Sequence, residues 1–131
     1  MTLVVNSRKD KYSKYIGRSK HDDMHFGNPF FVSTKKTKLG KVEVENLREC
    51  LLAFHDWLKG TRYHDVEPER RQWILDNLDQ LKGQTLGCFC KPNACHGDIY
   101  LVLLGEKTLD EVLPPPTPTL AREEAPQFDL F

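Results

Sequence analysis

The residues with the clearest chemical potential are three cysteines, a histidine and an aspartate within residues 87–98, which read GCFCKPNACHGD. Thiolates and imidazole nitrogens are good zinc ligands. Cys90, Cys95 and His96 could therefore approach one ion across the loop, with Cys88 or an aspartate as the fourth ligand. The spacing is not that of a zinc ribbon, and adjacent Cys95 and His96 would normally point apart. A zinc site is therefore one of several readings of this segment.

The same segment also supports catalysis without a metal. If Cys95 begins a helix, the helix dipole lowers the pKa of its thiol. His96 is then a candidate base and Asp98 a candidate acid for nucleophilic or acid–base chemistry.

Two further interpretations of the segment concern the start of the same helix. Gly97 and the first amides of the helix could cradle a phosphate group, with Lys91 as the nearby positive charge. A purely structural reading is a strand-to-helix turn in which Asp98 caps the helix and the cysteines pack in the interior.

Arginines near the amino terminus provide a second set of candidate ligands. Arg8 and Arg18 each follow an expected strand, and a guanidinium group suits bidentate contact with phosphate or carboxylate. Asn28 lies in a predicted turn at residues 27–29. His21 and His25 could form a metal pair, although two histidines in a solvated loop are the simpler interpretation.

The elements that must position these residues alternate between strand and helix patterns. Short β-branched or apolar runs predict strands, and apolar spacings of three and four predict helices. The strands are expected over residues 2–6, 14–18, 30–33 and 84–90, and the helices over 42–59, 68–81 and 99–104. The last helix could instead be a strand. This order predicts an α/β fold for residues 1–113, a compact Rossmann-like domain of two or three layers with a mostly parallel sheet. Its ligand site should lie at the carboxyl ends of the strands.

The charge of the chain is zero overall but uneven along it. Nineteen Lys and Arg residues balance nineteen Asp and Glu residues, yet residues 1–41 hold ten basic and three acidic residues. This argues against a uniformly basic coat and favours one anion-facing side, for a nucleotide or DNA. No apolar run is long enough for a membrane span or a signal peptide, so a cytoplasmic location with no membrane partner is expected.

Beyond residue 113 the composition changes. Residues 114–126 are rich in proline, which predicts a disordered linker and a flexible C-terminal tail. Residues 127–131, QFDLF, hold two phenylalanines and a leucine that a small core does not obviously need.

Three motifs of this sequence resemble a family. YIGR at residues 15–18, GNPF at 27–30 and LGCxCxPxxCHGD at 86–98 look like a small domain-of-unknown-function family of phages and bacteria, over about residues 3–104. The resemblance implies a small α/β domain and no established reaction. It carries over the following residues as site residues only: Arg8, Arg18, Asn28, Cys90, Cys95, His96 and Asp98.

The C-terminal pentapeptide is similar to the motif with which bacterial replication and repair proteins bind the DNA polymerase sliding clamp. By that resemblance Leu130 and Phe131 would fill an apolar pocket and Gln127 would supply amide hydrogen bonds. Asp129 fits the pattern, whereas Phe128 stands where leucine is commoner.

The sequence thus predicts a phage or bacterial DNA-metabolism protein. Its core would bind or act on a nucleotide or DNA, and its C-terminus would tether it to the sliding clamp. One alternative is a non-enzymatic protein that competes for the clamp and inhibits host replication. Another is a zinc-stabilised DNA-binding module.

Overall fold

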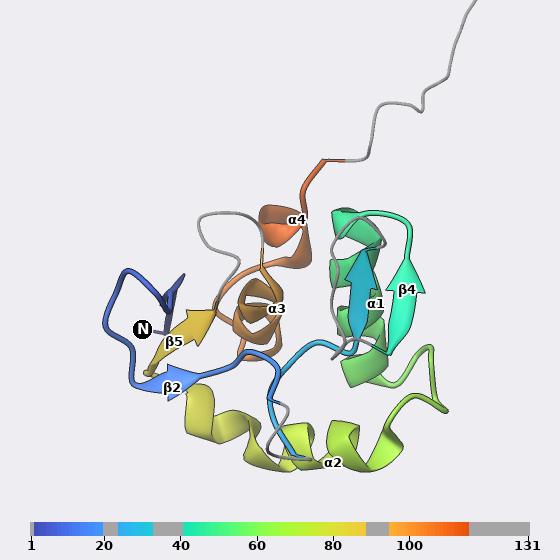
Figure 1. Ribbon diagram of the computed structural model, residues 1–131, viewed down its shortest axis with the longest axis horizontal. Coiled ribbons are helices and arrows are strands. Elements are labelled where there is room, and N and C mark those ends of the chain that lie inside the picture. Colours follow the sequence, from blue (N-terminus) through green and yellow to red (C-terminus); the bar gives the residue numbers. More distant parts are fainter. Residues whose placement is uncertain (1, 20–23, 33–40, 89–94, 116–131) are drawn as a thin grey trace, which may run out of the picture.

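A three-stranded parallel sheet in the order β1-β5-β2 forms one side of the protein (Figure 1). The structure, a computed structural model, describes residues 2–19, 24–32, 41–88 and 95–115. The strands are β1 (Leu3–Asn6), β2 (Lys14–Tyr15) and β5 (Thr85–Cys88). As predicted, β5 is the central strand, and its last residues pair with Asn6 of β1 and Tyr15 of β2, through Cys88 and Gly87 respectively. The carboxyl ends of all three strands therefore meet at one edge.

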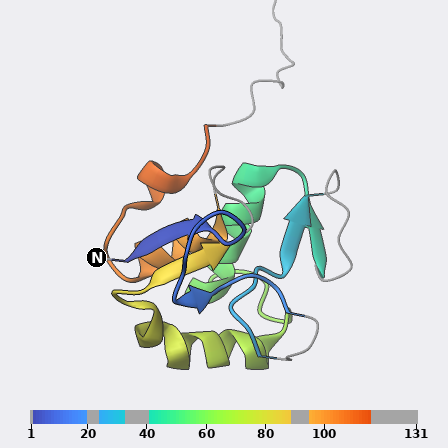
Figure 2. The same ribbon diagram turned by 60° about the vertical axis from the view of Figure 1, so that its left-hand side comes forward.

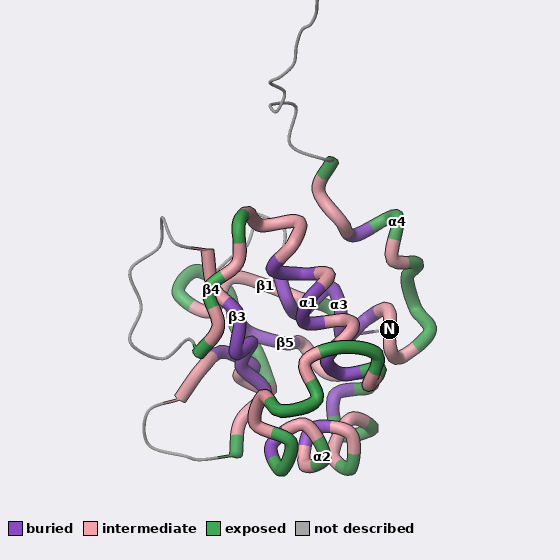
Figure 3. The backbone as a smooth tube through the Cα atoms, turned by 90° about the vertical axis from the view of Figure 1, so that its right-hand side faces the viewer, coloured by how far each residue is buried: buried purple, intermediate pink, exposed green. Residues whose placement is uncertain are grey.

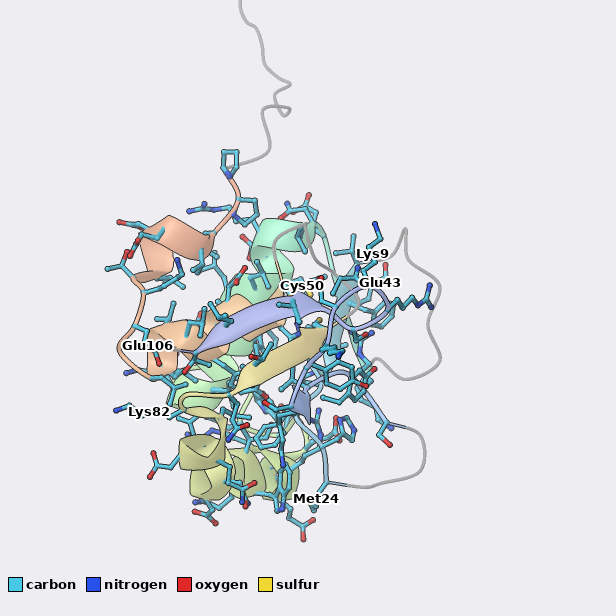
Figure 4. The ribbon with its side chains drawn as sticks, turned by 90° about the vertical axis from the view of Figure 1, so that its left-hand side faces the viewer. Lys9, Met24, Glu43, Cys50, Lys82 and Glu106 are labelled. Atoms are coloured by element: carbon cyan, nitrogen blue, oxygen red, sulfur yellow. The ribbon has the colours of Figure 1, made fainter. Side chains whose placement is uncertain are left out.

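Helix α3 (His96–Leu103) covers one face of this sheet (Figure 2). The close approach depends on Gly97, because a Cβ atom there would lie 2.8 Å from side-chain atoms of both Val4 and Ile16. The opposite face carries no helix of the described residues (Figure 4).

A second, two-stranded sheet pairs β3 (Phe30–Val32) with β4 (Val42–Val44), again in parallel. Helix α1 (Leu47–Lys59) packs against it. The helix begins where the Asn46 side chain accepts a hydrogen bond from the Glu49 amide at 2.9 Å. It ends at Gly60, whose φ of 80° is the left-handed conformation that glycine adopts freely.

The prediction of a helix over residues 42–59 was wrong for its first turn. Val42 and Val44 alternate with Glu43 and Glu45, which is the two-residue period of a half-buried strand. Pairing with β3 satisfies the backbone of this segment, and the cap at Asn46 sets the true start of the helix.

The bounds of the other predicted helices agree better with the structure. Helix α2 (Pro68–Asn77) continues as the 3-10 helix η1 (Leu78–Leu81), within the predicted range of 68–81. The apolar run at residues 99–104 is helical, and its helix α3 already begins at His96. A short helix that the sequence pattern did not indicate, α4 (Leu109–Val112), follows it.

Buried residues gather on α1, α3, β3 and β5 (Figure 3). This core is rich in aromatic side chains. Phe54 stacks on Trp57 at a centroid distance of 6.0 Å and meets Tyr100 edge-on at 5.4 Å. All three side chains have an exposed fraction of 0%. Large rings that bury this much apolar surface supply most of the driving force of a small core.

The α/β class and the parallel pairing are confirmed, although the strands form two small sheets. Among the described residues, no helix has the length and apolar character that crossing a bilayer would require.

Candidate functional site

Two thiols and an imidazole converge at the carboxyl edge of the three-stranded sheet. Cys88 is the last residue of β5, and Cys95 and His96 begin α3. The Sγ atoms of the two cysteines are 2.8 Å apart, and Nδ1 of His96 lies 3.6 Å from Cys88 Sγ and 3.7 Å from Cys95 Sγ. All three residues are buried. We call these three residues the thiol–imidazole cluster.

The start of α3 holds Cys95 and His96 in this arrangement. Cys95 is the N-cap residue, and its sulfur accepts a hydrogen bond from the Gly97 amide at 3.4 Å, where a serine hydroxyl would usually act. The Asp98 carboxylate accepts the Cys95 amide at 3.3 Å, which completes a capping box. The extended backbone of Cys95 turns its side chain back toward β5, so that neighbouring Cys95 and His96 face the same point. Their expected divergence is therefore wrong.

A hydrogen bond from Nε2 of His96 fixes the orientation of the ring and so of Nδ1. Nε2 lies 2.7 Å from the backbone oxygen of Ile16, just beyond β2. A carbonyl oxygen can only accept, so Nε2 carries the proton. In the neutral ring this leaves Nδ1 with a lone pair directed at the two sulfurs. Metal-binding histidines are held in this way by a carbonyl or carboxylate behind the ring.

The cluster has the composition and nearly the spacing of a metal site. The three donor atoms lie within 4.8 Å of one another. In a tetrahedral zinc site with the usual bond lengths, a sulfur and a nitrogen are about 3.6 Å apart and two sulfurs about 3.8 Å apart. The two sulfur–nitrogen distances match this geometry, and the sulfurs would have to separate by about 1 Å. Cys88, Cys95 and His96 could thus hold a metal ion.

Ser7 adds a further polar group at the same edge. It follows β1, and its amide donates to the Cys88 carbonyl at 3.0 Å. Its hydroxyl oxygen is buried and lacks a hydrogen-bond partner among the described residues. A buried hydroxyl without a partner is costly, so it marks a position where a ligand or a water molecule would be favoured.

Arg18 and Asn28 form a clasp around the GNPF segment. Arg18 donates from Nε to the Asn28 carbonyl at 2.6 Å and from Nη2 to the Phe30 carbonyl at 2.7 Å. The Asn28 side chain accepts the Phe30 amide at 2.8 Å and donates to Cys50 Sγ at 3.3 Å. These contacts are internal, and phosphate binding by Arg18 and Asn28 stays a prediction.

Arg70, which the sequence reasoning missed, holds the same segment from α2. Its Nη1 donates to the carbonyls of His25 and Gly27 at 2.9 and 2.6 Å, and Glu67 pairs with its other side. Only 3% of the side chain is exposed. No local signal distinguishes Arg70 from the neighbouring arginine in a polar helix, because the two carbonyls that it binds lie more than forty positions away.

Tyr100, on α3, reaches the residue that precedes the GNPF segment. Its hydroxyl donates to the Phe26 carbonyl at 2.6 Å. Complete burial raises the pKa of Tyr100 well above its ordinary value, an effect that Arg70 opposes and that the nearby thiols reinforce. The phenol is therefore a permanent donor at any ordinary pH.

The other predicted site residues take separate places. Arg8 is exposed just beyond β1, and its amide donates to the Asn6 side chain at 2.9 Å. Gly97 lies against the sheet, as the close contacts with Val4 and Ile16 require. His25 accepts the Gly27 amide through Nδ1 at 3.1 Å. Predictions at the following positions lie outside the described residues: His21, Cys90, Lys91 and 127–131.

Comparison with known proteins gives a family and no relative of known activity. No curated protein and no solved structure matches the chain. One family model matches residues 5–106, and its description is Domain of unknown function (DUF4326). This range begins within β1 and extends past α3, and so it contains the whole thiol–imidazole cluster. The chain belongs to the DUF4326 family of domains of unknown function.

Proposed function

We propose that this protein acts in the DNA metabolism of a bacterium or phage, as a metal-bearing core joined to a sliding-clamp-binding peptide. The observation that carries the proposal is the position of the thiol–imidazole cluster at the carboxyl edge of a parallel sheet. Ligands of α/β folds bind at this edge. Arg8 and the Ser7 hydroxyl lie at the same edge and supply groups that suit a phosphate-bearing ligand such as a nucleotide or DNA.

Zinc is the metal that this donor set favours. Two thiolates and one imidazole are characteristic zinc ligands, and soft sulfur ligands disfavour magnesium and calcium. Cys90, two residues from Cys88, is the candidate for a fourth ligand, and water is the alternative. Four protein ligands make a structural site, whereas an open position lets bound zinc activate water or polarise a substrate.

Zinc binding and thiol catalysis are competing uses of the same atoms. A Cys95 thiolate that ligates zinc is not a free nucleophile, and His96 Nδ1 cannot both bind metal and accept a proton. The buried position of both cysteines and the carbonyl behind His96 favour the metal site. Catalysis by Cys95, His96 and Asp98 without a metal is the alternative.

The metal is tested by its stoichiometry. The purified full chain should contain about one zinc per molecule, as a closed or three-ligand site requires. Cys88→Ser and Cys95→Ser should each lose most of it, whereas Cys50→Ser should keep it, because Cys50 lies near Asn28 and outside the cluster. A wild-type chain that stays free of zinc after dialysis against excess zinc would refute the site.

The clamp contact is supported by the motif QFDLF at residues 127–131. Leucine and phenylalanine side chains are suited to fill an apolar pocket, and a peptide tether raises the local concentration of the core at DNA. Clamp binding should require these five residues. The measurement is a titration of a bacterial sliding clamp with the full chain and with a chain that ends at Pro126.

A double variant and a single-residue control sharpen the titration. Replacing both Leu130 and Phe131 by Ala should abolish clamp binding, whereas Leu120→Ala, outside the motif, should leave it intact. Equal binding by the full and the shortened chain would contradict the proposal. If the clamp is bound but Cys95→Ser leaves every function of the core unchanged, a non-enzymatic clamp competitor is the better description.

A further inference from the structure

The face of the three-stranded sheet that α3 leaves open carries an exposed tyrosine laid flat on the backbone. A Cβ atom at Gly87 of β5 would lie 2.6, 2.8 and 2.9 Å from Cγ, Cδ1 and Cδ2 of Tyr12. Near-equal distances to three ring atoms mean that the ring meets Gly87 with its face. Tyr12 is nevertheless 44% exposed, so its other face is turned to solvent.

The placement of Tyr12 follows from the alternation of β5. Leu86 and Cys88 point into the core, where they are almost completely buried, and Gly87 between them points to the opposite side. Because Gly87 has no side chain, the ring of Tyr12 can lie directly on the strand. Tyr15 adds a second ring at a centroid distance of 6.2 Å, tilted by 48°.

Hydrogen bonds hold the segment that carries Tyr12 at both ends. Residues 9 and 10 turn back onto the Asn6 carbonyl, with amide–oxygen distances of 3.2 and 3.0 Å. At the other end the Ser13 amide donates to the Thr85 carbonyl at 2.9 Å, and the Ser13 hydroxyl bonds to the Gln84 side chain at 2.7 Å. The ring is thus presented by an ordered segment, which lowers the entropic cost of binding.

Basic residues precede this ring closely in the sequence. Arg8, Lys9 and Lys11 are all exposed, and Asp10 is the one acidic residue between β1 and β2. Figure 4 places Lys9 beyond the carboxyl end of β1, the end at which the thiol–imidazole cluster lies, and Lys82 and Glu106 at the opposite end. Basic groups together with an exposed aromatic ring are the combination with which proteins hold single-stranded nucleic acids.

We propose that the open face of the sheet binds single-stranded DNA, with Tyr12 stacking on a base and Arg8, Lys9 and Lys11 contacting phosphates. This inference rests on the proposed function and names the ligand class of its core. A duplex keeps its bases stacked on one another and offers no base face to Tyr12, so the single strand is the form that the geometry favours. The strand would run toward the edge that holds the thiol–imidazole cluster.

The test is the binding of a fluorescent oligothymidylate to the full chain, measured by anisotropy at low and moderate salt. Tyr12→Ala should weaken binding roughly 5- to 100-fold, which is the usual range for the loss of one stacked base. Tyr12→Phe keeps the ring and should stay within about twofold of wild type. A thermal melt of each variant establishes that it is folded.

The phosphate contacts are tested separately, by the dependence of the binding affinity on salt concentration. Replacing Lys9 and Lys11 by Gln should lower the slope of log affinity against log salt by about 0.7 for each contact removed. Lys82→Gln, an exposed lysine at the other end of the sheet, is the matched control and should leave the slope unchanged. These surface variants do not touch the core.

Several results would overturn the inference. Wild-type affinity in Tyr12→Ala, equal or tighter binding of a duplex of the same length, or tighter binding of oligouridylate would each do so. Clamp binding and zinc content are measured separately, so a protein that binds clamp and zinc but no oligothymidylate loses this inference and keeps the rest of the proposed function.

Discussion

At the scale of single residues, several positions serve the fold and the candidate site together. Gly97 allows α3 to approach the sheet, and its amide also supports the Cys95 sulfur. Arg70 and Arg18 direct their donors to backbone carbonyls of residues 25–30, which include the GNPF segment. Each of these residues has a small set of named partners, so substitution gives a specific expected cost.

Gly97→Ala should lower the free energy of unfolding by about 1–3 kcal/mol, the usual cost of overpacking a core. The added methyl group would meet Val4 and Ile16 at 2.8 Å. Urea unfolding measures the change. The double variant with Val4→Ala should recover part of the loss, and an unchanged stability of Gly97→Ala would show that the helix can shift away at no cost.

Arg70→Met should cost about 2–4 kcal/mol, because two buried carbonyls lose a charged donor. Arg62 is the matched control, since its side chain is 46% exposed where it pairs with Asp56. Arg62→Met should change the unfolding free energy by less than about 1 kcal/mol. Similar effects of the two substitutions in urea unfolding would contradict the role given to Arg70.

At the scale of elements, the structure shows which helices and strands the sequence pattern predicts correctly. Apolar runs located β1 and β5, and the spacing of Leu47, Leu51 and Leu58 located α1. The same reasoning extended α1 over β4, because it gave helical spacing priority over the alternation of valine and glutamate. Asn46 with Glu49 three residues later was the local signal for the true boundary.

The start of α1 can be tested directly. Asn46→Ala should lower the unfolding free energy by about 1 kcal/mol, since the Glu49 amide loses its acceptor. Asn46→Asp retains an acceptor oxygen and should stay within a few tenths of a kcal/mol of wild type. Chemical denaturation of the three proteins measures this, and equal losses for both variants would argue against a capping role.

The sequence predicted which residue types form the candidate site, but only some of the residues that belong to it. Cysteine and histidine at residues 87–98 indicated metal or thiol chemistry, and Cys95 and His96 do lie together. The third member among the described residues is Cys88, which the sequence offered only as an alternative ligand. Cys88 joins the site because β5 ends there and α3 turns back toward it. The ring of His96 is oriented by the carbonyl of Ile16, which is distant in sequence. Residue spacing encodes none of these features.

At the scale of the whole molecule, the amino terminus is tied to the segment after α3. The Thr2 amide and hydroxyl donate to the two carboxylate oxygens of Glu106 at 2.9 and 2.7 Å. The same hydroxyl accepts the Gly83 amide at 2.8 Å. Three segments far apart in the sequence therefore meet at the end of the sheet opposite the candidate site.

This contact should make stability depend on pH. The hydrogen bonds from the Thr2 side chain and amide hold the pKa of Glu106 below its ordinary value of 4.5. A lowered pKa in the folded state means that the contribution is fully present above pH 4.5 and is lost as the pH falls through the folded pKa. The stability difference between wild type and Glu106→Gln should therefore shrink below about pH 4.5. Urea unfolding from pH 7 to pH 3 measures it, with Glu69→Gln on the exposed side of α2 as control. A difference that stays constant over this range would contradict the linkage.

The strand order β1-β5-β2 also has a consequence for synthesis. β1 pairs only with β5 among the described strands, and Leu3 lies opposite Thr85, eighty-two positions later in the chain. At the usual speed of about 5–20 residues per second, a ribosome exposes the first strand for several seconds before its partner is made. The second sheet and α1 come from residues 30–59 and can form in this interval. The first sheet is therefore assembled late during synthesis, and Cys88, Cys95 and His96 come together only then.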